Sequence, residues 1–213
     1  MKFLTILALL VNVNVVVGQT PLTRDQILGS ISSRQGAFPG VLLSTSVFSD
    51  QNSYQYKARE AAARVLPNSG FGSTKIIEYY ALACLYYSTN SVSNARTNSI
   101  IPGQALDPWK RTDEWINEPN YCLWYGIVCA NPTFNVKQIN LANNTLTGEF
   151  PPEILFLGNT LDRIDLYSNF FHYAIKYNWF SQMIALEDLF FGTTSWDSDG
   201  IPAEVSDLKT LRK

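Results

Sequence analysis

Two cysteines lie close together in the chain, and cysteine side chains support three kinds of chemistry. Cys122 and Cys129 bracket the octet CLWYGIVC, with Trp124 and Gly126 between them. Paired thiolates can bind a metal ion, take part in redox exchange, or close a disulfide. The spacing alone leaves these three interpretations open.

Few other residues have the types and spacing of a catalytic or metal site. His172 is the only histidine, and no serine and acid accompany it in a legible catalytic pattern. Asp197 and Asp199, in DSDG, lack the downstream glutamate that would complete a calcium loop. The sequence therefore favours a protein that is not an enzyme and that uses no metal or other cofactor.

The composition is that of a packed globular protein. Of 213 residues, 46% are hydrophobic and 16% are charged, and the net charge is −2. The chain has no block of Lys and Arg residues, which argues against nucleic acid as a partner.

The N-terminus has the pattern of a secretory signal peptide. Lys2 precedes an apolar run over 3–17, and small residues precede a plausible cleavage point after Gly18. The run is shorter than the roughly 20 apolar residues of a membrane span. We predict a signal peptide over 1–18, with a retained anchor as the alternative, no other transmembrane span, and a secreted or extracellular location. The oxidising environment outside the cell would favour a disulfide.

Two segments have strong helical patterns. Residues 53–66 are rich in Ala, Arg and Glu and end at a proline, and residues 73–89 carry an apolar face at spacings of three and four. Cys84 lies on that face, either as a small buried residue or as a thiol for intermolecular pairing. Residues 19–52 are expected to be largely loop, apart from a short helix at LTRDQILGSI with Thr23 as its N-cap.

From Val136 onward the sequence repeats every 25 residues. The units are 136–160, 161–185 and 186–210, and Leu211 starts another. Apolar residues recur at offsets 0, 3, 5 and 10 of each unit: Val136, Ile139, Leu141 and Leu146, then Leu161, Ile164, Leu166 and Phe171, then Leu186, Leu189, Phe191 and Trp196. The residues at offset 8 are Asn144, Asn169 and Thr194.

The repeat predicts one short strand for each unit. Residues at offsets 3 and 5 point the same way from a strand, because successive side chains alternate between its two faces. A single unit buries too little to fold alone, so stacked units form a parallel sheet over one core. The asparagine column suits a turn, where its amide can bond exposed backbone groups.

The repeat resembles the plant-type leucine-rich repeat, L-x-x-L-x-L-x-x-N-x-L-x-G-x-[IF]-P. Unit one, VKQINLANNTLTGEFPPEI, follows that pattern nearly throughout, and CLWYGIVC resembles the C-x-W-x-G-V-x-C signature of the N-terminal cap in this family. The resemblance implies an α/β fold: a helical cap over 53–135, followed by a short solenoid over 136–213 with one parallel strand per repeat.

The resemblance also decides between the roles of the two cysteines. It implies a Cys122–Cys129 disulfide that closes a cap over the first strand, whose edge would otherwise be bare. A zinc site lacks ligands, since only His172 and Cys84 remain. A redox dithiol is normally a C-x-x-C motif beside a βαβ unit, and none is present.

A binding surface is predicted from the strand alternation, because residues at offsets 2, 4, 6 and 7 point away from the core and together form a small concave patch. The predicted ligand-binding residues are Gln138, Asn140, Asn143, Arg163, Asp165, Tyr167, Asp188 and Phe190. Tyr167 and Phe190 are the aromatic anchors, flanked by polar groups. Asn143 also begins N-N-T, the only N-glycosylation sequon of the chain.

The sequence is therefore interpreted as a non-catalytic, secreted or cell-surface module that binds a protein, peptide or glycan. Three alternatives stay open: the N-terminal part of a longer receptor-like or adhesion protein, a structural wall or matrix component, and a hydrolase using Asp165 or Asp188. The uncapped C-terminal edge is expected to be covered by further repeats or by self-association.

Overall fold

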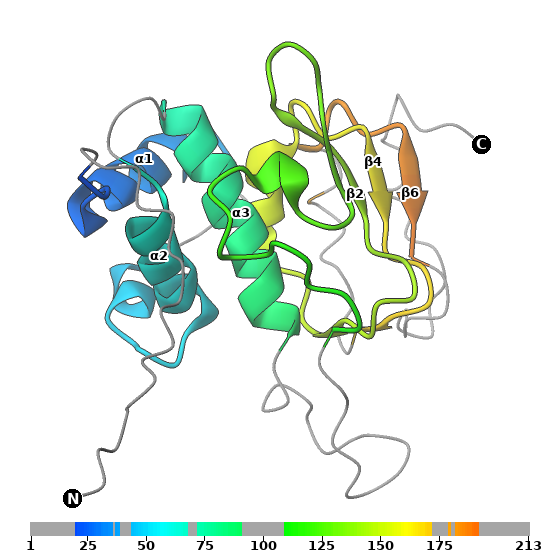
Figure 1. Ribbon diagram of the computed structural model, residues 1–213, viewed down its shortest axis with the longest axis horizontal. Helices are drawn as coiled ribbons and strands as arrows, with labels where there is room; N and C mark the ends of the chain where they lie inside the picture. Colours follow the sequence, from blue (N-terminus) through cyan, green and yellow to red (C-terminus); the bar gives the residue numbers. More distant parts are fainter. Residues whose placement is uncertain are drawn as a thin grey trace, which may run out of the picture.

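The computed structural model describes residues 20–35, 37–38, 44–67, 72–90, 109–171, 179 and 182–191. The predicted signal peptide, His172, Asp197, Asp199 and the chain after Phe191 lie outside these residues. The described part is α/β. In Figure 1 helices occupy one side of the molecule and a sheet occupies the other, with the strands β2, β4 and β6 in line.

Three helices form the helical side. They are α1 (Arg24–Gln35), α2 (Tyr54–Val65) and α3 (Ser73–Thr89), with a short 3-10 turn, η1 (Thr45–Phe48), between the first two. The two strong helical patterns are thereby confirmed. α3 contacts α1, α2 and η4 (Pro152–Leu157), and 12 of its 17 residues are buried, as expected for a helix that is apolar nearly all round.

The expectation that 19–52 is largely loop is wrong for α1 and η1. The predicted short helix starts where expected but continues to Gln35. Thr23 and Gln26 form a reciprocal capping box: the Thr23 N–H donates to Gln26 Oε1 at 2.8 Å, and the Gln26 N–H donates to Thr23 Oγ1 at 3.2 Å. Ile27 and Ile31, one turn apart, are fully buried, so tertiary packing overrides the weak helix propensity of Gly29 and the serines.

The four-stranded sheet takes one strand from each 25-residue unit. Its order is β1-β2-β4-β6, where β1 is Ile127–Cys129, β2 is Val136–Asn140, β4 is Arg163–Asp165 and β6 is Asp188–Phe190. β1 pairs antiparallel with β2, and the other two pairings are parallel. A second, two-stranded sheet joins β3 (Thr147–Gly148) to β5 (Phe170–Phe171) in parallel.

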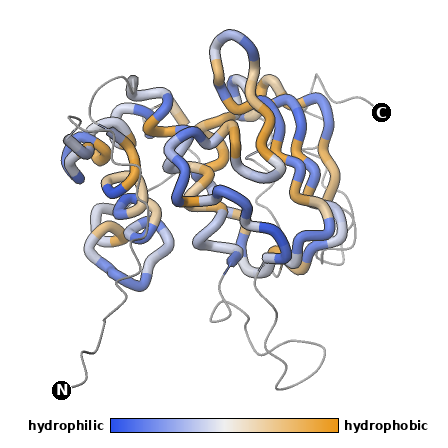
Figure 2. The backbone as a smooth tube through the Cα atoms, viewed as in Figure 1, coloured by the Kyte–Doolittle hydropathy of each residue, from blue (hydrophilic) through white to orange (hydrophobic). Residues whose placement is uncertain are grey.

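The apolar columns fill the interior between the sheet and the helices. The residues at offsets 0, 3 and 5 of the first two units are all 0% exposed: Val136, Ile139, Leu141, Leu161, Ile164 and Leu166. Figure 2 shows the resulting alternation of hydrophobic and hydrophilic segments along the parallel strands.

Buried asparagines connect successive units, as the offset-8 column predicts. Asn169 Oδ1 accepts from the backbone N–H of Asn144 and of Leu146, both at 3.0 Å. Its Nδ2 donates to the carbonyls of Leu141 at 2.8 Å and Leu166 at 2.9 Å. Asn144 makes the equivalent pair of bonds to one residue outside the repeats: its Oδ1 accepts from Arg111 N–H at 2.8 Å and its Nδ2 donates to Arg111 O at 3.1 Å.

Candidate ligand-binding face

The strand register places the predicted binding residues in rows across the sheet. Gln138 is opposite Arg163, which is opposite Asp188. Asn140 is opposite Asp165, which is opposite Phe190. Tyr167 and Asn143 follow β4 and β2, and the Asn143 N–H donates to Tyr167 O at 2.8 Å. We call these eight residues the strand face.

Arg163 connects three of the strands on this face. Its guanidinium donates to Asn140 at 3.2 Å, to Asp165 at 3.1 Å and to Asp188 at 3.2 Å. It also lies 4.5 Å from the ring centroid of Phe190, within cation–π range. These four polar side chains therefore bond to one another, which fixes their geometry before any ligand arrives.

The two aromatic residues of the strand face are exposed. Tyr167 is 52% exposed and Phe190 is 42% exposed. Large apolar side chains that stay this accessible beside polar groups suit a binding surface. The charged residues form the support and the two aromatic rings provide the accessible contact area.

Asn143 is exposed at the rim of the strand face. Its backbone is left-handed, with φ 53°, and its Oδ1 accepts from Lys110 Nζ at 2.7 Å. The exposure suits the sequon, and glycosylation of Asn143 stays a prediction.

The sequence analysis missed three residues next to this face. Val128, in β1, is opposite Gln138 and is 42% exposed, so the antiparallel strand extends the row by one residue. Lys110 and Arg111 lie beside the face because they hydrogen-bond the side chains of Asn143 and Asn144. The position of Val128 directly before Cys129 could have predicted its place beside the first repeat. Lys110 and Arg111 could not be predicted in this way, because they lie in a segment without strand periodicity.

The disulfide joins Cys122 and Cys129, and the segment around it folds tightly against β2. The S–S distance is 2.03 Å and the Cα–Cα distance is 5.6 Å. Gly126 has φ +80°, and a Cβ at this position would lie 2.4 Å from Asn140 O. Only glycine at position 126 allows the backbone of the octet to lie this close to β2.

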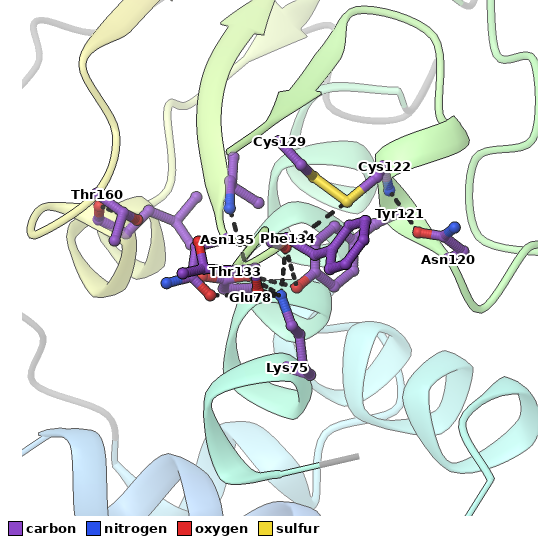
Figure 3. Close-up of polar contacts among 12 residues, drawn as sticks. Lys75, Glu78, Asn120, Tyr121, Cys122, Cys129, Thr133, Phe134, Asn135 and Thr160 are labelled. Atoms are coloured by element: carbon purple, nitrogen blue, oxygen red, sulfur yellow. Dashed lines mark hydrogen bonds and ion pairs between the residues drawn. A yellow bond between two sulfur atoms is a disulfide. The ribbon is translucent and has the colours of Figure 1, made fainter. Parts of the chain in front are cut away.

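A polar cluster anchors the loop between β1 and β2 to α3 (Figure 3). Lys75 Nζ donates to Thr133 O at 3.0 Å, to Phe134 O, and to Asn135 Oδ1 at 3.3 Å. Glu78 accepts from Tyr121 Oη and, at 3.4 Å, from Val136 N–H. Burial raises the pKa of Glu78, and the Tyr121 hydroxyl and the Lys75 ammonium oppose that rise. The cluster fixes the start of β2.

A shallow groove of about 320 Å³ runs along the starts of the parallel strands. Lys137, Asp162 and Glu187 line it from successive units, and Lys137 Nζ lies 2.8 Å from Asp162 Oδ2. The groove therefore adds mixed charge to one border of the strand face.

Within the described ranges, the acids, histidines and cysteines form no group of three that could bind a metal ion. In the same part of the chain, no helix has both the length and the apolar character needed to cross a bilayer.

Comparison with curated proteins finds plant leucine-rich-repeat receptor kinases, and no family model matches. The chain is 43% identical over 58 residues to the Arabidopsis thaliana receptor-like kinase ERECTA, 31% over 71 residues to TDR from the same species, and 39% over 56 residues to SIK1 from Oryza sativa subsp. japonica. These alignments cover 26%, 33% and 26% of this chain, and 6%, 7% and 6% of the relatives.

Among solved structures, similar folds include PEPR1-AtPEP1, with 28% identity, 48% of this chain and 15% of that chain covered, and a TM-score of 0.40. The BIR2 ectodomain of Arabidopsis thaliana has 18% identity, coverage of 63% and 62%, and a TM-score of 0.44. In the aligned stretches the chain is similar to plant leucine-rich-repeat receptor kinases, and its parallel strands pair residues that lie 25 positions apart, as such a repeat requires.

Proposed function

We propose that the chain is a non-catalytic binding module that recognises a peptide on its strand face. Residues 53–135 act as the helical cap of a short solenoid over 136–213, and a signal peptide over 1–18 directs the module to the extracellular side. The observation that carries the proposal is the pair of exposed aromatic rings, Tyr167 and Phe190, on a parallel ladder whose polar residues are already bonded to one another.

An extended peptide suits this surface better than a compact ligand. The strand face is a shallow strip formed by one short strand from each unit, with side chains of successive units in register. A linear ligand lying across the strands would contact one position in each unit. Aromatic side chains provide such contacts with little loss of conformational freedom.

A second interpretation is that the module is the N-terminal part of a longer receptor-like protein. The aligned residues of this chain span 6–7% of the length of the receptor kinases it matches. In that case the same face would form the first part of a longer binding strip.

The proposal is tested by panning a displayed library of random linear peptides on the full chain. We expect enriched peptides that bind the wild type and lose binding to the Tyr167→Ala/Phe190→Ala double variant. Phe134→Ala is the matched control, because Phe134 is 58% exposed but belongs to the β1–β2 loop. Binders that tolerate the double variant, or no binders, would contradict the proposal.

A further inference from the structure

The three parallel strands and the residues just before them carry more carboxylates than cations. The charged residues at these positions are Lys137 on β2, Asp162, Arg163 and Asp165 at β4, and Glu187 and Asp188 at β6. Two cations and four carboxylates give these strands a net charge of −2. The excess lies on β4 and β6.

Each of the two cations already contacts a carboxylate, Lys137 in the groove that borders the strand face and Arg163 on the strand face itself. Lys137 Nζ is 2.8 Å from Asp162, and Arg163 reaches both Asp165 and Asp188. The side chains of Asp165 and Asp188 are 21% and 32% exposed, so they remain within reach of a ligand. Arg163 is therefore already paired within this face, and an acidic group of a ligand would be repelled by the carboxylates beside it.

The Phe190 ring offers a cation–π contact beside these carboxylates. The Arg163 guanidinium already lies 4.5 Å from its ring centroid, so the ring is used as a cation–π partner within the molecule. The ring is still 42% exposed, directly follows Leu189 and Asp188, and is opposite Asp165. A guanidinium or ammonium group could contact the aromatic ring and a carboxylate together.

The opposite border of the strand face has the opposite charge. Lys110 contacts Asn143 at 2.7 Å, and Arg111 lies 3.7 Å from the ring centroid of Tyr125. Arg111 is paired with Asp113 at 2.9 Å, whereas the Lys110 ammonium contacts the neutral Asn143 amide, so Lys110 brings a positive charge to this border. The sign of the charge therefore changes from the β1 end of the sheet to the β6 end, which would orient a ligand.

We infer that the ligand of the strand face is a basic, extended peptide that places a Lys or Arg side chain against Phe190, Asp165 and Asp188 at the β6 end. This inference rests on the proposed function and adds the chemical class of the ligand and its direction.

The test analyses the peptides that the wild-type chain selects, taking those that the Tyr167→Ala/Phe190→Ala variant loses. We expect Lys and Arg to be enriched and Asp and Glu depleted relative to the starting library. The affinity of a selected peptide should fall about tenfold in Asp188→Asn, which corresponds to about 1.4 kcal/mol. It should also weaken as NaCl rises from about 50 to about 500 mM, since partly exposed charges are screened.

Asp25→Asn is the matched charge control, because Asp25 is exposed on α1, away from β6 in Figure 1. It should leave peptide affinity unchanged. Replacing the Lys and Arg residues of a selected peptide by Gln should abolish the sensitivity to Asp188→Asn.

Two other outcomes have distinct meanings. Selected peptides that are neutral or acidic but still need Tyr167 and Phe190 would overturn the inference and leave the proposed function standing. An absence of binders that depend on these two rings would overturn both. Unchanged melting temperatures of the variants would show that the losses come from the surface and not from unfolding.

Discussion

Glu153 is a fully buried carboxyl group at the contact between α2 and η4. It is 0% exposed, and its Oε2 accepts from Tyr54 Oη at 3.2 Å. Burial raises its pKa to about 7, and hydrogen bonds from its own backbone, Gln55 and Tyr54 only partly oppose that rise. The folded protein therefore favours the neutral acid.

This carboxyl group should make folding stability depend on pH. Its pKa is higher in the folded than in the unfolded chain, so the folded state holds the proton between about pH 4.5 and pH 7. The contribution to stability is full at acidic pH and is lost as the pH rises through 7, by up to about 3 kcal/mol. Glu78 adds a change of the same sign.

Denaturant unfolding at pH 5 and pH 8 checks this prediction. Glu153→Gln should flatten the difference between the two pH values, and the remainder should come from Glu78. Glu60→Gln is the control: Arg24 lowers the Glu60 pKa, so its effect lies at more acidic pH. An unchanged pH dependence in Glu153→Gln would contradict the assignment.

At the scale of single residues, the sequence identified the positions but not their interactions. Even offsets predicted that Arg163, Asp165 and Asp188 share one face, because strand alternation needs only the repeat. The mutual bonds of these residues need side-chain geometry across three strands, which a linear pattern does not contain. Lys75 and Glu78 lie more than 40 residues from Tyr121 and from the loop they anchor, so no local signal announced that cluster.

The disulfide element stabilises the approach to the first parallel strand. The segment between Cys122 and Cys129 includes part of η3 (Tyr121–Leu123) and all of β1, and Trp124 within it is 1% exposed. Trp124 packs at 4.8 Å from Trp115 and 5.0 Å from Tyr79, measured between ring centroids. The bond therefore holds an aromatic contact between the octet and α3.

Removal of the disulfide should weaken folding without changing the fold. Closing an eight-residue loop contributes about 2.5 kcal/mol in the loop-entropy description. Cys122→Ser/Cys129→Ser should lower the melting temperature by several degrees, as thermal denaturation followed by circular dichroism would show. The unfolded wild type should have one reactive thiol, Cys84, before reduction and three after it. An unchanged melting temperature would contradict the stabilising role.

Among elements, β2, β4 and β6 were predictable, α1 was predictable only in part, and β1, β3 and β5 were not predicted. The strands β2, β4 and β6 follow from two apolar offsets repeated every 25 residues, which local sequence contains. The length of α1 depends on Ile27 and Ile31 finding partners on other helices, and no rule of local propensity includes those partners.

Across the whole molecule, the helices α1 and α2 form a layer that is bound to α3 and to the first repeat. Arg34 donates to Phe156 O at 3.2 Å, and Tyr54 reaches Glu153 from α2. Leu22 N–H donates to Leu66 O at 3.1 Å, which joins the two ends of this layer. The layer covers one side of α3, which elsewhere contacts η4, β3 and Trp124 of the octet.

Deletion of the layer should therefore disrupt the entire fold. A chain beginning at residue 68 would expose the α3 side chains that now contact α1 and α2, and we expect it to lose its cooperative thermal transition. The full chain should unfold in one transition by both circular dichroism and tryptophan fluorescence. A truncated chain that still melts cooperatively would show that α1 and α2 are dispensable.

The asparagine contacts have a consequence for how such a molecule changes in evolution. The Asn169 side chain hydrogen-bonds backbone groups of unit one, and the Asn144 side chain hydrogen-bonds the backbone of Arg111. Arg111 therefore takes the place that a preceding unit would occupy. Each unit contacts the preceding unit through the same kind of interface, so duplication of a 25-residue segment reproduces an interface that already exists. A shift by a single residue does not, because the asparagine then meets the wrong backbone groups. The gene is therefore expected to lengthen or shorten in steps of 75 nucleotides, while the segment around Arg111, which the first unit contacts, stays unchanged.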